Sequence, residues 1–308
     1  THHPALRGFY DQVIMDLTEE NVRETAKKSD VIMIQVPSGD VAKWAEIVLA
    51  EDCAIIDIGA DIRFRDVDVW EKWYGQKHPD AKMTHDAVYC IPEVMRDLAK
   101  GKKLIANPGC YPTASTLGLQ PMLKAGHIVD NTIVIDAKSG YTGAGRRPAL
   151  NKLLTEAENN FCAYALGGGH RHTPEIEQNI AYITGKDLMK PETWQYINFQ
   201  PHLLPQVRGI EVTIYATCDR DFTNEEVYEL YKDFYKDEPF VKVFPASLPV
   251  QTKWVYGTNF CEMTPTFDAR THRLIVSSVI DNIGKGAAGQ AIQAANLVCG
   301  FEETAGLT

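Results

Sequence analysis

Short apolar runs alternate with amphipathic stretches along the first 110 residues, and this alternation constrains the fold more than any other feature. The apolar runs cover residues 31–37, 54–59 and 103–109, and each ends at proline or glycine. Residues 40–50 place their apolar side chains on one helical face. Strands rich in Ile and Val, separated by helices, are typical of a parallel sheet, which binds ligands at the carboxyl ends of its strands. We therefore predict an α/β domain with functional residues just after these runs.

The pattern changes at about residue 132, where strand-like segments follow one another with few helices between them. Thr223 and Glu226 form the capping box of one predicted helix. Residues 284–300 predict a second helix, whose small side chains suit close packing. This arrangement predicts an α+β second domain. Its predicted strands are residues 132–140, 196–205, 210–218, 253–260 and 273–281.

Length and composition limit the function. At roughly 100–200 residues per domain, 308 residues suggest two domains. The net charge of -10 disfavours a nucleic-acid or anionic-membrane binder, and no apolar run reaches the ~18 residues of a membrane span. Seven scattered cysteines without a CxxC pair exclude a zinc ribbon and a regular disulfide framework. We expect a cytoplasmic protein that acts on a small molecule, without nucleic-acid or membrane partners.

The sharpest local motif is NPGCYPT at residues 107–113. A strand runs into the Pro108–Gly109 turn, and Pro112 suits the first turn of a helix. Cys110 is therefore predicted at a helix N-terminus, where free backbone N–H groups favour the nucleophilic thiolate. The alternative is a buried structural cysteine, which is our interpretation of the other six.

A nucleophilic cysteine needs a base, and GGGHRHTPE at residues 167–175 offers His170 and His172. Both precede a helix that we predict to be capped by Thr173 with Pro174 at its first position. A metal site at this His-x-His pair lacks a third ligand nearby, so we predict no metal.

Arginines and a second glycine-rich segment supply candidate anion sites. Residues 139–147 (SGYTGAGRR) follow a predicted strand, and their small side chains allow a ligand to approach the backbone. Arginine binds phosphate and carboxylate through two hydrogen bonds, which makes Arg63 and Arg208 further candidates. Ordinary surface ion pairs are the alternative for each arginine.

Six motifs occur in one order along the chain: NPGCYPTA, SGYTGAGR, GGHRHTPEIEQ, FQPHLLPQVRGI, GTNFC and IDNIGKGAAGQAIQAANL. In these motifs the chain resembles the N-acetyl-gamma-glutamyl-phosphate reductase family, from about His3 to the end. The resemblance implies NADPH-dependent reduction of N-acetyl-L-glutamyl 5-phosphate in arginine biosynthesis. The products would be N-acetyl-L-glutamate 5-semialdehyde and phosphate, formed through a cysteine thioester.

The resemblance also implies an architecture. A Rossmann domain would comprise residues 1–109 and 286–308. Residues 110–285 would form an α+β catalytic and oligomerisation domain like that of glyceraldehyde-phosphate dehydrogenase. The active protein would be a homo-oligomer, either a dimer or a tetramer.

Site residues follow from the same resemblance. The nucleophile falls on Cys110, and the acid–base histidine falls on His172, favoured narrowly over His170. The NADP(H) site falls on Pro37, Ser139, Gly140, Gly143, Ala144, Gly145, Asn282 and Gly286. Arginines for the substrate carboxylates and phosphate are Arg63, Arg146, Arg171 and Arg208.

The chain departs from the family pattern at its start. The family opens with a strand and a Gly-x-x-Gly-x-x-Gly turn, whereas Gly8 is the single glycine before Gly39 here. We therefore expect that an N-terminal βα element is missing. Gly59 is a smaller departure, at a position where serine is commoner.

Other functions remain open from the sequence. A sister reductase could use the same chemistry on aminoadipate phosphate or aspartyl phosphate. A cysteine hydrolase would release its acyl-enzyme with water and need no nicotinamide. A non-catalytic remnant could have lost the nucleotide loop, although it would retain Cys110, His170 and His172.

Overall fold

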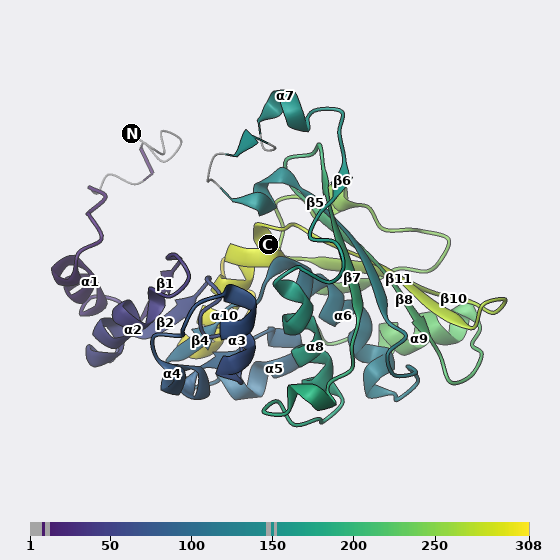
Figure 1. Cartoon of the computed structure of the whole chain (residues 1–308), viewed down its shortest axis with the longest axis horizontal. Coiled ribbons are helices and arrows are strands. Elements are labelled where there is room, and N and C mark those ends of the chain that lie inside the picture. Colours follow the sequence, from purple (N-terminus) through teal and green to yellow (C-terminus); the bar gives the residue numbers. More distant parts are fainter. Residues whose placement is uncertain (1–7, 10–12, 146–148, 151–152, 308) are drawn as a thin grey trace.

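Two β-sheets lie side by side in the computed structural model, which describes residues 8–9, 13–145, 149–150 and 153–307 (Figure 1). The smaller sheet has the order β1-β2-β4-β3, and all its pairings are parallel. This confirms the predicted parallel α/β unit and its three strands. β3 was missed because two residues carry no recognisable pattern. The bounds are β1 Val31–Ile34, β2 Ala54–Asp57, β3 Val88–Tyr89 and β4 Leu104–Ala106.

Helices enclose this sheet. α2 and α10 pack against its strands, and α1 packs on α2. The core is made of strand residues such as Ile56 and Ile105 against the alanines of α10, for example Ala291 and Ala294. Aspartates cap α3 and α4, which explains where these helices begin. The bounds are α1 Glu19–Ala26, α2 Val41–Ala50, α3 Val67–Tyr74, α4 Ala81–Asp86, α5 Pro92–Ala99 and α10 Gly289–Cys299.

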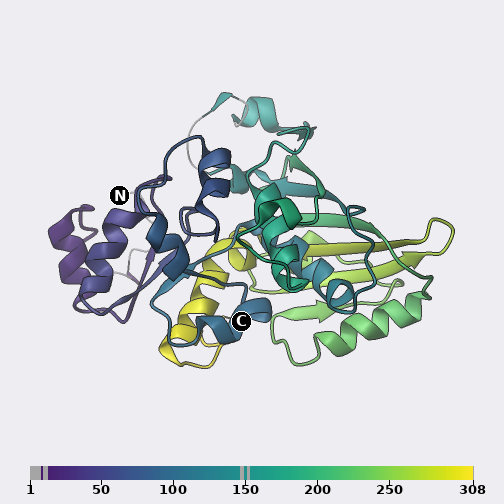
Figure 2. The ribbon, with the colours of Figure 1, turned by 60° about the horizontal axis from the view of Figure 1, so that its bottom comes forward.

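The larger sheet is mixed, with the order β6-β7-β5-β8-β11-β10-β9. β5 pairs parallel with β7 and β9 with β10, and the other pairs are antiparallel. Helices α6 and α9 pack on it, and Figure 2 shows α9 running along the sheet. The α+β second domain is thereby confirmed. The bounds are β5 Val134–Gly140, β6 Cys162–Ala163, β7 Asn198–Leu204, β8 Ile210–Thr217, β9 Val241–Val243, β10 Cys261–Asp268, β11 Arg273–Ile280, α6 Cys110–Lys124, α8 His172–Ile183 and α9 Asn224–Phe234.

One predicted strand was wrong. Residues 253–260 form a turn, because Gly257 adopts a left-handed φ of 76° and the N–H of Thr258 bonds back to the carbonyl of Val255. The strand lies just after it, as β10. Its first five residues are all buried, so no alternation of apolar and polar residues marks it in the sequence. The capping box of α9, by contrast, is present as predicted.

The segment before α10 is a π-helical turn, η6, spanning Gly284–Ala288. Its glycines permit close approach of other backbone. A Cβ on Gly284 would lie 2.2 Å from the carbonyl oxygen of Thr258, and one on Gly286 would lie 2.8 Å from the Cβ of Cys110. The small residues predicted to suit close packing therefore bring this turn against the start of α6. Among the described residues, no helix combines the length and apolar character that a membrane span requires.

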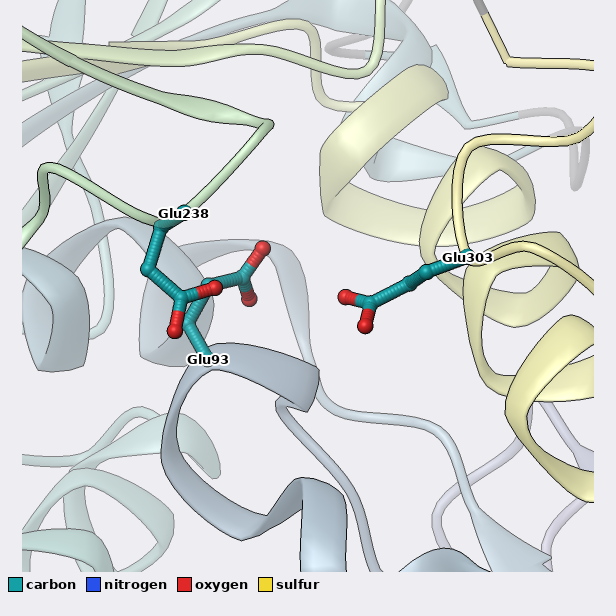
Figure 3. Close-up of side chains that lie close together, drawn as sticks. All are labelled: Glu93, Glu238 and Glu303. Atoms are coloured by element: carbon teal, nitrogen blue, oxygen red, sulfur yellow. The ribbon is translucent and has the colours of Figure 1, made fainter.

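An ionic cluster lies between α5, the segment that follows α9 and the C-terminal segment, and Figure 3 shows its three glutamates. The carboxylates of Glu93, Glu238 and Glu303 offer oxygens within 4.8 Å of one another, which is a spacing that could hold a metal ion. Arg96 already binds Glu238 and Glu303 at 2.5 and 2.7 Å, and Lys285 binds Glu93 at 2.6 Å. These cations occupy the place of a metal, so the cluster connects α5, η6 and the C-terminal segment.

Replacing Lys285 should destabilise the fold. Burial alone would raise the pKa of Glu93, but the charge and hydrogen bond of Lys285, together with a hydrogen bond from Gln293, lower it overall. Lys285→Met would leave this carboxyl group buried without its partner, so we expect a loss of about 3–5 kcal/mol in the free energy of unfolding. The Lys285→Met/Glu93→Gln double variant should lose less. Urea denaturation of both variants measures this, and a double variant less stable than the single would contradict it.

Candidate active site

The turn between β4 and α6 positions Cys110 as predicted, at the carboxyl end of a parallel strand and the first residue of a helix. Gly109 is the N-cap, in an extended conformation. Asn107, at the end of β4, is fully buried, and its Nδ2 donates to the carbonyl of Ala287 in η6 at 3.2 Å. A hydrogen bond therefore connects the turn before Cys110 to the π-helical turn η6.

Burial dominates the ionisation of Cys110. It raises the pKa of the thiol to about 11, although the backbone N–H of Tyr111 and the charge of Arg63 lower the pKa in part. The helix start acts in the predicted direction, but it does not determine the net shift of the pKa. The helix does lower the pKa, but desolvation of the charged form is the larger effect. The thiol of Cys110 is therefore protonated near neutral pH.

The raised pKa predicts how Cys110 reacts with iodoacetamide, which consumes the thiolate. At neutral pH the thiol is protonated, so the alkylation rate should rise about ten-fold per pH unit from pH 7 to about pH 10. Peptide mass spectrometry follows alkylation at this one cysteine. A rate that is already constant above pH 8 would mean that the thiolate is stabilised.

The two histidines lie at the start of α8, which begins at His172 with Arg171 as its N-cap. The prediction that Thr173 is the cap was wrong by two residues. The side chain of Thr173 instead donates to the carbonyl of Gly168, while Nδ1 of His170 accepts the backbone N–H of His172 at 3.0 Å. The glycine run thus folds back on the helix, and His170 takes the capping role.

His172 lies against Gly109, the residue before Cys110. A Cβ on Gly109 would be 2.5 Å from Nε2 of His172, so only glycine allows the imidazole to reach this position. The ring of His170 is 4.8 Å from that of His172 and also contacts Tyr164 and Phe199. Burial lowers the pKa of His170 to about 4 and that of His172 well below its ordinary value. Both rings are therefore neutral at pH 7 and can accept a proton.

The guanidinium of Arg63 is hydrogen-bonded to three groups at the site. Its Nε and Nη2 donate to the carbonyls of Asn107 and Ile58 at 2.9 and 3.0 Å, and Nη1 binds Glu175 at 3.1 Å. Burial alone would lower the pKa of Arg63, but Glu175 raises it above its ordinary value. The predicted anion site is thus a buried cation held between the ends of β2 and β4.

Glu175 is the main residue that the sequence interpretation missed. Its carboxylate accepts the backbone N–H of Gly109 at 2.8 Å and the hydroxyl of Tyr89 at 2.9 Å, besides the Arg63 pair. It is fully buried, one turn after His172 on α8. The HTPE spacing, which puts a carboxylate on the same helical face as the histidine, was the available signal. Glu175 therefore fixes the position of Gly109 relative to His172.

These groups open into a cleft of about 770 Å³. Tyr74, Gln76 and Tyr164 also line it and were not predicted. Arg171 stacks its guanidinium 4.7 Å above the ring of Tyr74. The predicted residues that the structure brings together in the lining are Pro37, Arg63, Cys110, Ser139, Gly143, His170, Arg171 and His172.

Other predicted residues lie next to the cleft rather than in its lining. Asn282 accepts the N–H of Gly209 at 2.8 Å and donates to Thr142 at 2.9 Å. Arg208 pairs with Asp281 at 3.3 Å, so the structure does not place it in the cleft. Ala144 lines an adjoining cavity of about 370 Å³. Gly140 and Gly145 belong to the same loop, Gly286 packs behind Cys110, and Arg146 lies outside the described residues.

The glycine-rich loop and the strand ends that line the cleft suit the binding of a nicotinamide cofactor. A Cβ on Gly140 would lie 2.8 Å from the carbonyl of Gln206, and one on Gly143 would lie 2.8 Å from the hydroxyl of Ser139, so this loop is kept close to the backbone beside the cleft. Opposite, the carboxylate of Asp61 accepts the N–H of Gly39 at 2.8 Å and holds the loop after β1. Residues of both loops line the cleft together with Cys110, so both are available to hold a flat ring.

Comparison with known proteins agrees with both halves of the molecule. Residues 2–102 match the semialdehyde dehydrogenase NAD binding domain, and residues 110–282 match the semialdehyde dehydrogenase dimerisation domain. The crystal structure of aspartate semialdehyde dehydrogenase II from Vibrio cholerae is similar in fold, with a TM-score of 0.66 and 18% identity. That match covers 88% of this chain and 80% of the other.

Sequence relatives are closer. N-acetyl-gamma-glutamyl-phosphate reductase of Desulforudis audaxviator is 45% identical over 99% of this chain and 85% of its own length. The protein of the same name from Synechocystis is 44% identical over 92% of this chain and 78% of its own length. The chain therefore belongs to the N-acetyl-gamma-glutamyl-phosphate reductase family of semialdehyde dehydrogenases.

Proposed function

We propose that this protein reduces N-acetyl-L-glutamyl 5-phosphate to N-acetyl-L-glutamate 5-semialdehyde and phosphate with NADPH, a step of arginine biosynthesis. One observation carries the proposal: a neutral His172 lies against Gly109, immediately before a protonated Cys110 at the end of a parallel strand. This pair suits acyl transfer through a thioester. The names of the full-length relatives support the substrate.

Acyl transfer would proceed in one cleft. Sγ of Cys110 attacks the acyl carbon, the new S–C bond forms, and the bond from that carbon to the phosphate oxygen breaks. His172 accepts the thiol proton during attack and returns it to Sγ when the S–C bond later breaks. The first N–H groups of α6 stabilise the negative charge that develops on the acyl oxygen. Glu175 keeps Gly109 and the helix start in register with His172.

NADPH would bind in the same cleft and, when bound, supplies hydride to the acyl carbon. Pro37, Ser139 and Gly143 line its binding surface. We propose that residues 1–109 and 286–308 form the cofactor-binding domain and residues 110–285 the catalytic and oligomerisation domain. Gly140, Ala144, Gly145, Asn282 and Gly286 would shape the cofactor loops without lining the cleft.

Different arginines would interact with the different negatively charged groups of the substrate. Arg171 lines the cleft and is held over Tyr74, so it is placed to bind a carboxylate. Arg63 borders the cleft beside Cys110 and would stabilise the departing phosphate through its field, since its N–H groups are engaged internally. We still propose Arg146 and Arg208 as substrate-binding residues. Arg208 does not line the cleft, and Arg146 lies outside the described residues.

We also propose that the protein is a cytoplasmic homodimer or a tetramer built from such dimers. The face of the larger sheet opposite α6 carries the partly exposed side chains of Val134, Tyr215 and Ile275, and no described helix packs over them. The match to a dimerisation domain supports self-association, and we propose this face as the contact. Light scattering coupled to gel filtration would give the mass, and a monomer at micromolar concentration would contradict the proposal.

Phosphate-dependent reduction of NADP+ by N-acetylglutamate semialdehyde tests the function in the reverse direction. The wild-type chain should be active, and Cys110→Ser should be inactive. Aspartate semialdehyde tests the alternative substrate class under the same conditions. Faster turnover of the aspartyl compound would reassign the substrate, and equal activity of wild type and Cys110→Ser would exclude the thioester route.

A further inference from the structure

A second cavity, of about 330 Å³, lies between α5, α8 and the segment that joins α4 to β3. Arg63 borders both cavities, but this one is separate from the cleft of Cys110. Its volume is in the range of small-molecule sites. Most of its surface is apolar, contributed by Ile62, Val88, Met95, Leu98, Tyr182 and Leu188.

Three cations line this cavity in a protein whose net charge is -10, and one of them, Arg63, is paired with Glu175. Arg65 and Lys102 are exposed, and neither forms an ion pair with a carboxylate among the described residues. Nη1 of Arg65 donates to the carbonyl of His85, which fixes the guanidinium at the cavity. Asp86 is the single acidic residue in the described lining. The balance at the cavity is therefore positive and suits an anion.

Asn179 contributes a buried acceptor without a partner. Its side chain is almost fully buried, and Nδ2 donates to the hydroxyls of Tyr89 and Thr116, both at 2.9 Å. Oδ1 is buried and accepts no hydrogen bond from the described residues. Buried polar atoms are normally paired, so an unpaired acceptor in the wall of a cavity indicates a place for a donor.

We propose that this cavity binds a small organic carboxylate with a flat apolar body and one hydroxyl or N–H donor. The carboxylate lies at Arg65 and Lys102, and the apolar body packs on the wall formed by α5 and α8. The donor is directed to Oδ1 of Asn179. Nothing in the reaction at Cys110 uses these three residues, so the site is additional to the proposed function.

The same asparagine connects the cavity to the nucleophile. Asn179 donates to the hydroxyl of Tyr89, which donates to Glu175 at 2.9 Å, and Glu175 accepts the N–H of Gly109 at 2.8 Å. A ligand that bonds Oδ1 therefore acts on the hydrogen-bonded chain that positions Cys110. We expect its binding to change the alkylation rate of Cys110 by at least two-fold.

Isothermal titration of the full chain with 6-hydroxy-2-naphthoate tests the site. We expect one site per chain and at least ten-fold weaker binding of the neutral 6-hydroxy-2-naphthamide. The Arg65→Gln/Lys102→Gln double variant should weaken binding of the acid at least ten-fold, and Leu98→Trp should abolish it by filling the cavity. Leu98 is 46% exposed, so this change does not disturb the core.

Lys100→Gln is the matched control, because Lys100 follows the same helix but pairs with Asp97 and does not line the cavity. It should bind the acid as the wild type does. No binding by the wild type, equal binding by Leu98→Trp, or displacement by NADP+ would each overturn the site. Binding that leaves the alkylation rate of Cys110 unchanged would overturn its connection to the nucleophile.

Discussion

Replacing His172 with asparagine should lower kcat by about 10²–10⁴-fold, the usual contribution of a general base. The thiol of Cys110 has a pKa of about 11, so the fraction of thiolate at neutral pH is too small to sustain attack without a base. His172 lies against Gly109, immediately before Cys110, and its lowered pKa keeps it neutral and able to accept the proton. Steady-state kinetics of NADP+ reduction measure the effect.

The neighbouring histidine provides the control for this result. His170→Asn should lower kcat by less than about ten-fold, because His170 accepts the backbone N–H of His172 and acts on orientation. The activity of His172→Asn should also recover in part as the pH rises towards 10, since the thiolate then forms without a base. A larger loss of kcat for His170→Asn than for His172→Asn would mean that His170 is the base and His172 the positioning residue.

Gly109→Ala should lower activity by about 10²-fold while leaving the protein folded. The added methyl group would lie 2.5 Å from Nε2 of His172 and 3.0 Å from Nη1 of Arg63, so the imidazole must move away from Cys110. Misplacement of a catalytic group by about 1 Å has a cost of this size. Gly109 has a φ of -71°, which alanine adopts freely, so backbone strain does not contribute.

Two measurements separate displacement of His172 from damage to the fold. The midpoint of thermal unfolding should change by only a few degrees, and the pH profile of Cys110 alkylation should keep its high apparent pKa. Full activity of Gly109→Ala would show that His172 does not need its position against Gly109, and would contradict its assignment as the base.

Local patterns predicted much of the site. A strand that runs into Pro108–Gly109, followed by Cys110 and Pro112, predicts the position of Cys110 at the helix start, because proline and glycine restrict or permit particular backbone conformations. The glycine run before His170 and the small residues of η6 were recognised for the same reason. These features depend only on residues that are neighbours in the chain, so they can be predicted from the sequence alone.

Contacts between distant segments could not be predicted in this way. Glu175 bonds to Gly109 and Tyr89, which are 66 and 86 residues away, and no local pattern encodes these distances. The pKa of Cys110 depends on desolvation by residues from distant parts of the chain, so the helix start alone could not predict the net shift. The sequence suggested that Arg208 was free to bind an anion. Its partner in the structure, Asp281, is 73 residues away in the chain, so no local pattern indicated the ion pair.

The thioester on Cys110 is the central claim, and trapping it is the most direct test. The wild-type protein is mixed with N-acetylglutamate semialdehyde and NADP+ without phosphate, so that the acyl group has no acceptor, and is then analysed by peptide mass spectrometry. We predict an N-acetylglutamyl adduct on the peptide that carries Cys110, lost when phosphate is added. Reduction of NADP+ with no adduct, or with the adduct on another cysteine, would contradict the account.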